Sequence, residues 1–282
     1  MKKIIQILAL ITVVIFFESC SNSNNDDIVI VEEEDIRILL KTFNIEISAQ
    51  YSIPANVDRI ETGTVLLELY DDDTLDYTII VNDLSSTDEL LFAHVHTGDL
   101  VSNGHFAIGL INNIDNFFDG NTASGTFDLS QGQIDILNGP DIYFNLHSAE
   151  KQAGLLRGSL DKTIDFSMDI ILSTSNTVPP VMGRIETGIV YLRMDSESIL
   201  HYKILIDDLD KLDQITAAHI HFGETGTTGS VFITLAVSDL DIGITKILEF
   251  TSGDKTIFLN DNLYINVHSL LESNGLLRGQ IR

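Results

Sequence analysis

Two pairs of histidines are the residues of this chain whose type and spacing could do chemistry. His94-Val95-His96 recurs 125 positions later as His219-Ile220-His221. Side chains alternate between the two faces of a β-strand, so each pair would place both imidazoles on one face. Imidazole is a common ligand of zinc and copper, and each pair could therefore supply half of a metal site.

A third histidine follows each pair. His147 lies in Tyr-Phe-Asn-Leu-His-Ser and His268 lies in Tyr-Ile-Asn-Val-His-Ser, where the residues that alternate with the histidine are apolar. The histidine should then lie on the polar face of its strand. Three imidazoles in each copy would suit copper or zinc. The alternative interpretation is structural, with the histidines bonded to backbone and to each other at a sheet edge.

No fourth histidine is shared by the two copies. His105 aligns with a serine, and His201 aligns with an aspartate. A site of three imidazoles with one open position would resemble catalytic rather than closed structural zinc sites. Because the ligands must be neutral, affinity should fall as the pH drops through about 6.5.

The duplication extends beyond the histidines. Arg-Ile-Glu-Thr-Gly occurs at 59–63 and 184–188, and Gly-Leu-Leu-Arg-Gly occurs at 154–158 and 275–279. Self-similarity of this kind indicates one structural unit present twice. We expect two domains, a first repeat at 44–162 and a second repeat at 167–282, each of a usual domain size.

Each repeat reads as a series of short strands. Residues 64–70 and 75–81 alternate apolar and polar side chains on either side of an acidic turn, which predicts a hairpin. No stretch sustains a helical period over three turns. The fold class is therefore all-β, with two tandem antiparallel β-sandwich domains. Further strands are expected at 91–96, 106–110, 125–129, 142–147 and 155–160.

The N-terminus predicts export and a lipid anchor. Lys2 and Lys3 precede an apolar run at 4–17, and Cys20 is the single cysteine of the chain. We expect a signal peptide at 1–19 and a flexible acidic tether at 20–43. The segment resembles the lipobox of bacterial lipoproteins, whose cysteine is acylated, although Glu18 departs from that pattern. A plain secretory signal with an incidental Cys20 is the alternative.

The resemblance places the protein in the cell envelope, anchored by lipid in the outer membrane and exposed at the surface. The formal net charge is −26, which argues against nucleic acid or an anionic membrane face as partner. The expected partners are an extracellular protein, a polysaccharide or a cation, and the membrane is contacted through the N-terminal lipid.

Arg157 and Arg278 are the arginines of the two Gly-Leu-Leu-Arg-Gly motifs. Arginine captures carboxylates or phosphates in a planar, bidentate manner, so each could bind an anion or form a structural salt bridge. The candidate salt-bridge partners are Glu61 or Asp83 in the first repeat, and Glu186 or Asp208 in the second repeat.

The motifs Ala-His-(Val/Ile)-His-x-Gly and Tyr-(Phe/Ile)-Asn-(Leu/Val)-His-Ser, followed by Gly-Leu-Leu-Arg-Gly, resemble the CHRD domain first described in chordin. The resemblance covers residues 45–162 and 168–282. The resemblance implies an extracellular β-domain. In the animal protein such domains belong to an antagonist that binds bone morphogenetic proteins, and nothing in this chain indicates that ligand.

The same histidine motifs are similar, more faintly, to strands of Cu/Zn superoxide dismutase. That enzyme places a His-x-His pair, a later histidine and an arginine around copper. The bridging histidine, zinc-loop ligands and disulfide cysteines have no counterparts in this chain. No nucleophile or phosphate-loop motif is present. The sequence therefore predicts a binding module and no enzyme, with a copper- or zinc-dependent, superoxide-dismutase-like redox or metal-handling role as the alternative.

Overall fold

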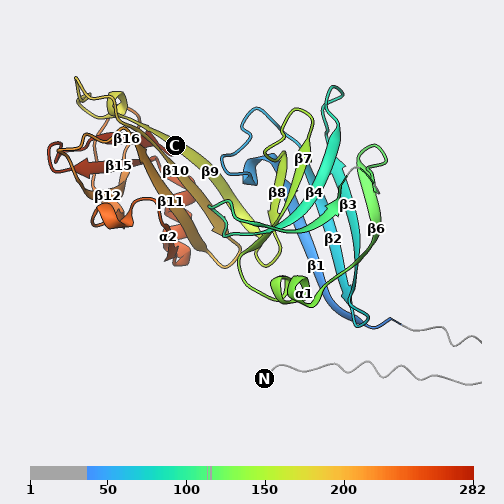
Figure 1. Ribbon diagram of the computed structural model, residues 1–282. Coiled ribbons are helices and arrows are strands. Elements are labelled where there is room, and N and C mark those ends of the chain that lie inside the picture. The colour runs from blue at the N-terminus through green and yellow to red at the C-terminus, as the bar shows by residue number, and fades with distance from the viewer. Residues whose placement is uncertain (1–36, 113, 115) are drawn as a thin grey trace, which may run out of the picture. The chain divides into compact units, whose positions relative to one another are not determined.

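The computed structural model describes residues 37–282 except residues 113 and 115 (Figure 1). The predicted signal peptide, Cys20 and most of the predicted tether lie outside the described residues. Neither of the two α-helices in the described part of the chain is long and apolar enough to cross a membrane.

The two repeats have the same order of strands and α-helices, and the second repeat has one additional short 3₁₀ helix. The first repeat contains β1 (Leu39–Ser48), η1 (Ala49–Tyr51), β2 (Thr62–Tyr70), β3 (Thr74–Asn82), β4 (Leu90–Thr97), β5 (Phe106–Ile111), β6 (Thr122–Asp128), α1 (Gln131–Leu137), β7 (Ile142–Ser148) and β8 (Leu156–Ser159). The second contains β9 (Ile164–Ser173), η2 (Thr174–Asn176), β10 (Thr187–Asp195), β11 (Ile199–Asp207), β12 (Ile215–Phe222), β13 (Val231–Ala236), η3 (Asp239–Asp241), β14 (Thr245–Glu249), α2 (Ser252–Asn260), β15 (Leu263–Ser269) and β16 (Leu277–Gln280).

Each repeat is built on one eight-stranded antiparallel sheet. The strand order is β5-β4-β7-β8-β1-β2-β3-β6 in the first repeat and β13-β12-β15-β16-β9-β10-β11-β14 in the second. Strands β8 and β1 are joined only through the residue pair Ser48 and Arg157. A Cβ at Gly158 would overlap the backbone of β1 at this corner, so the glycine permits the close approach.

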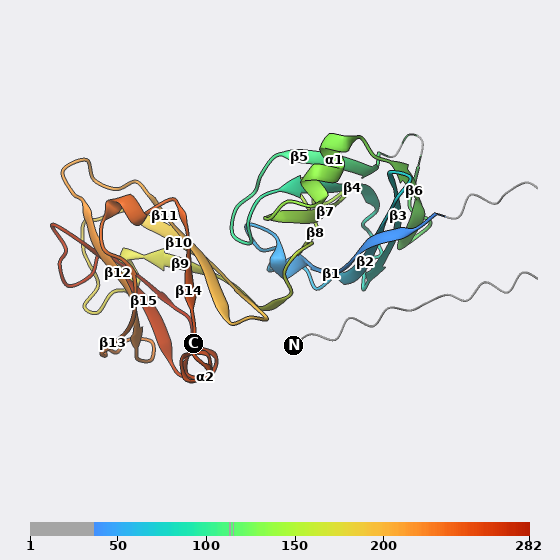
Figure 2. The ribbon, with the colours of Figure 1, turned by 90° about the horizontal axis from the view of Figure 1, so that it is seen from below.

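The sheet curls at this corner so that its two halves face each other over one apolar core (Figure 2). Leu67 of β2 and Phe144 of β7 belong to opposite halves, and both are fully buried in the same cluster. The prediction of two tandem all-β domains is confirmed, and the two expected layers are the halves of one sheet.

Three features differ from the sequence prediction. Strand β9 begins at Ile164, so the second sheet starts before residue 167, where the second repeat was expected to begin. Strand β1 begins at Leu39, so residues 39–43 belong to the first sheet and not to the tether that was expected to end at 43. The helices α1 and α2 were not predicted because they are too short to show a helical period. Each starts with a capping box, formed by Ser130 and Gln133 in α1 and by Thr251 and Asp254 in α2.

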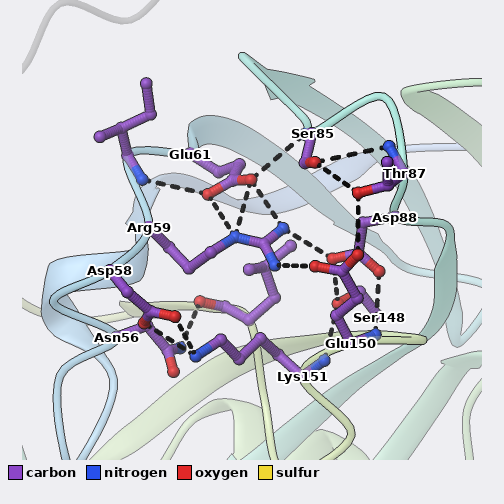
Figure 3. Close-up of polar contacts among 12 residues, drawn as sticks. Asn56, Asp58, Arg59, Glu61, Ser85, Thr87, Asp88, Ser148, Glu150 and Lys151 are labelled. Atoms are coloured by element: carbon purple, nitrogen blue, oxygen red, sulfur yellow. Dashed lines mark hydrogen bonds and ion pairs between the residues drawn. The ribbon is translucent and has the colours of Figure 1, made fainter.

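A buried ion network holds the first repeat together at one end of the sheet (Figure 3). The guanidinium of Arg59 lies 2.7 Å from Glu61 and 2.6 Å from Asp88. Asp88 precedes β4 and also accepts a hydrogen bond of 2.7 Å from Ser148, the last residue of β7. The network therefore fixes the start of β4 against the end of β7.

The second repeat has the same network. Arg184 lies 2.6 Å from Glu186 and 2.7 Å from Asp213, and Asp213 accepts a 2.7 Å hydrogen bond from Ser269 at the end of β15. Burial alone would raise the pKa of Asp213. Hydrogen bonds from Ser269, the amide of Leu271 and Arg184 outweigh burial and hold that pKa at about 2.

We expect Asp213→Asn to lower the free energy of unfolding by about 3 kcal/mol at pH 7, because it removes one partner of a buried ion pair. A carboxylate whose pKa is lowered from 3.8 to about 2 by folding stabilises the protein above pH 4. That stability is lost as the pH falls from about 4 to 2, and the variant should lose less over this window. Urea unfolding at a series of pH values tests this. The exposed Asp261→Asn is the control, and equal midpoints for both variants at pH 7 would contradict the prediction.

Candidate metal centres

The pairing of β4 with β7 brings three histidines to one face of the first sheet. His96 lies opposite Tyr143, and Phe92 lies opposite His147. The alternate residues Ala93 and Val95 are fully buried in the core. The histidines therefore lie on the outer face, as predicted from the alternation of the sequence.

The pairing of β12 with β15 repeats this arrangement. His221 lies opposite Tyr264, His268 lies opposite Ala217, and His219 is between them. We call His94, His96 and His147 the first triad, and His219, His221 and His268 the second triad.

In each triad one nitrogen from every imidazole lies within 4.8 Å of the others. Zn–N distances are about 2.0–2.1 Å, so ligands on one tetrahedral ion are roughly 3.3 Å apart. Side-chain adjustments of about an ångström would thus bring the three nitrogens onto one ion. Both groups consist of three histidines.

Backbone carbonyls set the orientation of two imidazoles in each triad. In the first triad, Nδ1 of His96 lies 3.4 Å from the carbonyl of Gly104, and Nδ1 of His147 lies 2.8 Å from the carbonyl of Gln152. A carbonyl only accepts, so Nδ1 carries the proton and Nε2 carries the lone pair. Metal-binding histidines in proteins are held by this kind of contact.

The second triad has equivalent carbonyl contacts. Nδ1 of His221 lies 3.0 Å from Gly229 O, and Nδ1 of His268 lies 2.9 Å from Ser273 O. Both rings thus present Nε2 to the triad.

Several nitrogens of the triads are buried without a partner in the described structure. They are Nε2 of His96, Nε2 of His221 and Nδ1 of His219. An unpaired buried polar atom costs about 1–3 kcal/mol. Nε2 of His147 instead lies 3.2 Å from the amide nitrogen of Asn145, a bond that a metal ion would replace. The donor set therefore fits a metal ion that prefers imidazole, copper or zinc.

Burial favours the neutral form of five imidazoles of the triads. Burial lowers the pKa of His94 to about 4, with smaller contributions from His147 and His96. Burial likewise lowers the pKa of His96, of His147, of His219 and of His221. Protons should therefore compete with a metal at a lower pH than the value of about 6.5 expected from the sequence.

A stack of three side chains supports one imidazole of each triad. The guanidinium of Arg157 lies 3.5 Å from the ring centre of Tyr143, which stacks on His96 with centroids 5.2 Å apart and planes at 14°. The Tyr143 hydroxyl also accepts the amide N–H of Gly104 at 3.2 Å. The stack fixes both the ring of His96 and the carbonyl that orients it.

In the second repeat the same stack is formed by Arg278, Tyr264 and His221, with distances of 3.5 Å and 5.1 Å. The sequence pattern placed these tyrosines on the same strand face as His147 and His268 but assigned them no role. Their signal was present, because the tyrosine and the asparagine of Tyr-x-Asn-x-His recur in both repeats.

The salt bridges predicted for Arg157 and Arg278 are wrong. Arg157 donates to Asn103 and to the backbone carbonyls of Asp99 and Ser102. Arg278 donates to the side chain of Gln280 and to two backbone carbonyls.

The expected glutamates are held by the arginines two residues before them, which are much closer along the chain: Arg59 holds Glu61 and Arg184 holds Glu186. Neither Arg157 nor Arg278 has an ion pair among the described residues.

The glycine that begins Gly-Leu-Leu-Arg-Gly makes room for the asparagine beside the triad. Gly154 has a φ of +135°, and a Cβ there would lie 2.5 Å from the side-chain oxygen of Asn145. Gly275 meets Asn266 in the same way. The repeated motifs thus meet around the histidines, although they are far apart in the sequence.

The two unrepeated histidines lie outside the triads. His105 is exposed. His201 is buried in the β10–β11 hairpin, with Nε2 3.0 Å from Asp195.

In a comparison with known families, the CHRD domain model matches residues 43–160 and 168–281. Searches of curated proteins and of solved structures gave no match.

We expect Gly154→Ala to lower the free energy of unfolding by more than about 1 kcal/mol, because alanine is strained at positive φ. It should also displace Asn145 from His147, which NMR of the imidazole signals would detect. Gly132→Ala in α1 is the control, since no atom lies within 4 Å of its added Cβ. Equal effects of the two variants in urea unfolding would contradict the role given to Gly154.

Proposed function

Since the chain belongs to the CHRD domain family and carries this domain twice, we propose that it is an extracytoplasmic binding module whose domains each hold one copper or zinc ion. The matching model describes a domain and not a catalytic class. The binding role follows from that family, and the metal follows from the histidines.

The observation that carries the proposal is the pair of equivalent histidine triads. In both, three imidazoles converge, carbonyls hold rings with Nε2 turned toward the group, and buried nitrogens have no partner among the described residues. A purely structural role would be served by paired nitrogens. A bound ion would use these nitrogens and leave a coordination position open to a further ligand.

The proposed location is the outside of the cell, at the outer membrane surface. Its support is the basic start, the apolar run and Cys20, which lie outside the described residues. The net charge of −26 would draw cations toward the module. Two domains on one tether would raise the effective concentration for a repetitive protein or polysaccharide partner.

The superoxide-dismutase-like alternative gains no support from the comparisons. The family that matches is the CHRD domain. We therefore propose binding of the ion as the main role.

We expect the purified chain to retain about one equivalent of Zn²⁺ or copper per domain after loading and dialysis. His96→Ala and His221→Ala should each remove one of the two equivalents, and the double variant should remove both. His105→Ala should retain both, because that exposed histidine lies outside the triads. Elemental analysis measures the content. Less than about a tenth of an equivalent per domain, or content unchanged in the double variant, would remove the proposal.

We expect Cys20→Ala to abolish incorporation of a clickable palmitate analogue in cells, because acylation requires the thiol. The labelled protein should fractionate with the envelope, and the variant should be released from it. Equal labelling of both proteins would contradict the proposal of a lipid anchor at Cys20 and would not bear on the metal sites.

A further inference from the structure

The two triads have the same ligands but different neighbours. In the first repeat, Phe92 stacks on His94 with centroids 6.0 Å apart and meets His147 edge-on at 6.5 Å. Phe106 meets His94 edge-on at 5.1 Å and His96 at 6.0 Å. Each imidazole of the first triad therefore has a phenyl ring beside it.

The second repeat lacks both rings at the equivalent positions, which hold Ala217 and Val231. The fit of Phe106 also depends on Gly109, whose Cβ position lies 3.3 Å from the Phe106 ring and 3.9 Å from His94. Thr234 replaces this glycine in the second repeat and pairs with His219. The phenyl rings of Phe92 and Phe106, which are themselves 36% and 60% exposed, therefore flank the first triad and not the second.

The second triad borders a cavity of about 490 Å³, whose lining includes His221, His268, Asn274 and Glu272 as well as the apolar side chains of residues 178–182. Glu272 brings a carboxylate to this cavity. The position that corresponds to it in the first repeat is Lys151, whose ammonium lies 2.8 Å from Asp58. The first repeat therefore has no carboxylate at this position.

These differences should affect whether each triad prefers a monovalent or a divalent ion. Transfer of an ion from water to apolar surroundings costs more for a divalent than for a monovalent ion, because the Born cost grows with the square of the charge. Zn²⁺ on three histidines takes a water or another fourth ligand, and Cu²⁺ prefers tetragonal N and O ligands. The Glu272 carboxylate or a water in this cavity can supply such a ligand, whereas the phenyl rings cannot.

We propose that the two triads select different ions: the first prefers Cu⁺ on three imidazoles under the phenyl rings, and the second prefers a divalent ion, Zn²⁺ or Cu²⁺, completed from the cavity beside Glu272. This inference rests on the proposed function. It adds that one chain carries a monovalent and a divalent site at the same time, set by neighbours and not by ligands.

The test uses the full chain with one triad disabled at a time. His221→Ala leaves the first triad, and His96→Ala leaves the second. Affinity for Cu⁺ is measured without oxygen by competition with bicinchoninate, and affinity for Zn²⁺ by competition with a chromophoric chelator. The ratio of Cu⁺ to Zn²⁺ affinity should be tenfold to a hundredfold higher for the first triad, as changes around a metal site typically produce.

Substitution of the side chains beside each triad tests whether they cause the difference in metal preference. Phe92→Ala with Phe106→Val should lower the ratio of the first triad, and Glu272→Gln should raise the ratio of the second by weakening Zn²⁺. Thermal unfolding of each variant without metal shows that it folds. Equal ratios for the two triads, or exchanges without effect, would overturn this inference alone. Failure of both triads to bind either ion would overturn the proposed function itself.

Discussion

The pairing of β4 with β7, with one face of both strands in the core, is the constraint on which the candidate centres depend. Side chains alternate along a strand, so a slip of one residue would turn the histidines inward and the core residues outward. The full burial of Ala93, Val95, Phe144 and Leu146 opposes such a slip. The ion network at Asp88 fixes the same register from the strand ends, through Ser148. Core packing and the buried ion network thus both hold β4 and β7 in the register that brings the three imidazoles together.

The contacts around each triad explain an energetically costly feature, namely a buried arginine that forms no ion pair with a carboxylate. Burial lowers the pKa of Arg157 to about 10, and the backbone carbonyls of Asp99 and Ser102 and the ring of Tyr143 compensate its charge. Beside the triad, a cation helps to keep His96 neutral, adding to the effect of burial on its pKa. A carboxylate at that place would favour the protonated imidazole. The arginine is thus compatible with an imidazole that would offer its lone pair to the proposed ion.

The two repeats differ in some residues around their three histidines and share others. Histidines, the stacked tyrosine and arginine, and the asparagine with its glycine occur in both repeats. The residues that lie over the rings differ, as Phe92 and Ala217 show. Ligand geometry depends on the backbone register and cannot vary without loss of the fold. The polarity above the ligands depends on single side chains at a surface, and it can change while the fold is kept.

The sequence by itself determined the duplication, the all-β class, the hairpins and the face on which each histidine lies, because these follow from repeats and from strand alternation within one segment. It did not determine that β4 neighbours β7, since strand order depends on which sheet edges meet after folding. Nor did it determine that Arg157 stacks on Tyr143 instead of pairing with Glu61. Arg59 reaches Glu61 from two residues away, whereas Arg157 reaches Tyr143 only because β7 and β8 are paired. Contacts within a strand or turn are set by local geometry; only the tertiary structure decided the contacts between strands, where the three histidines meet.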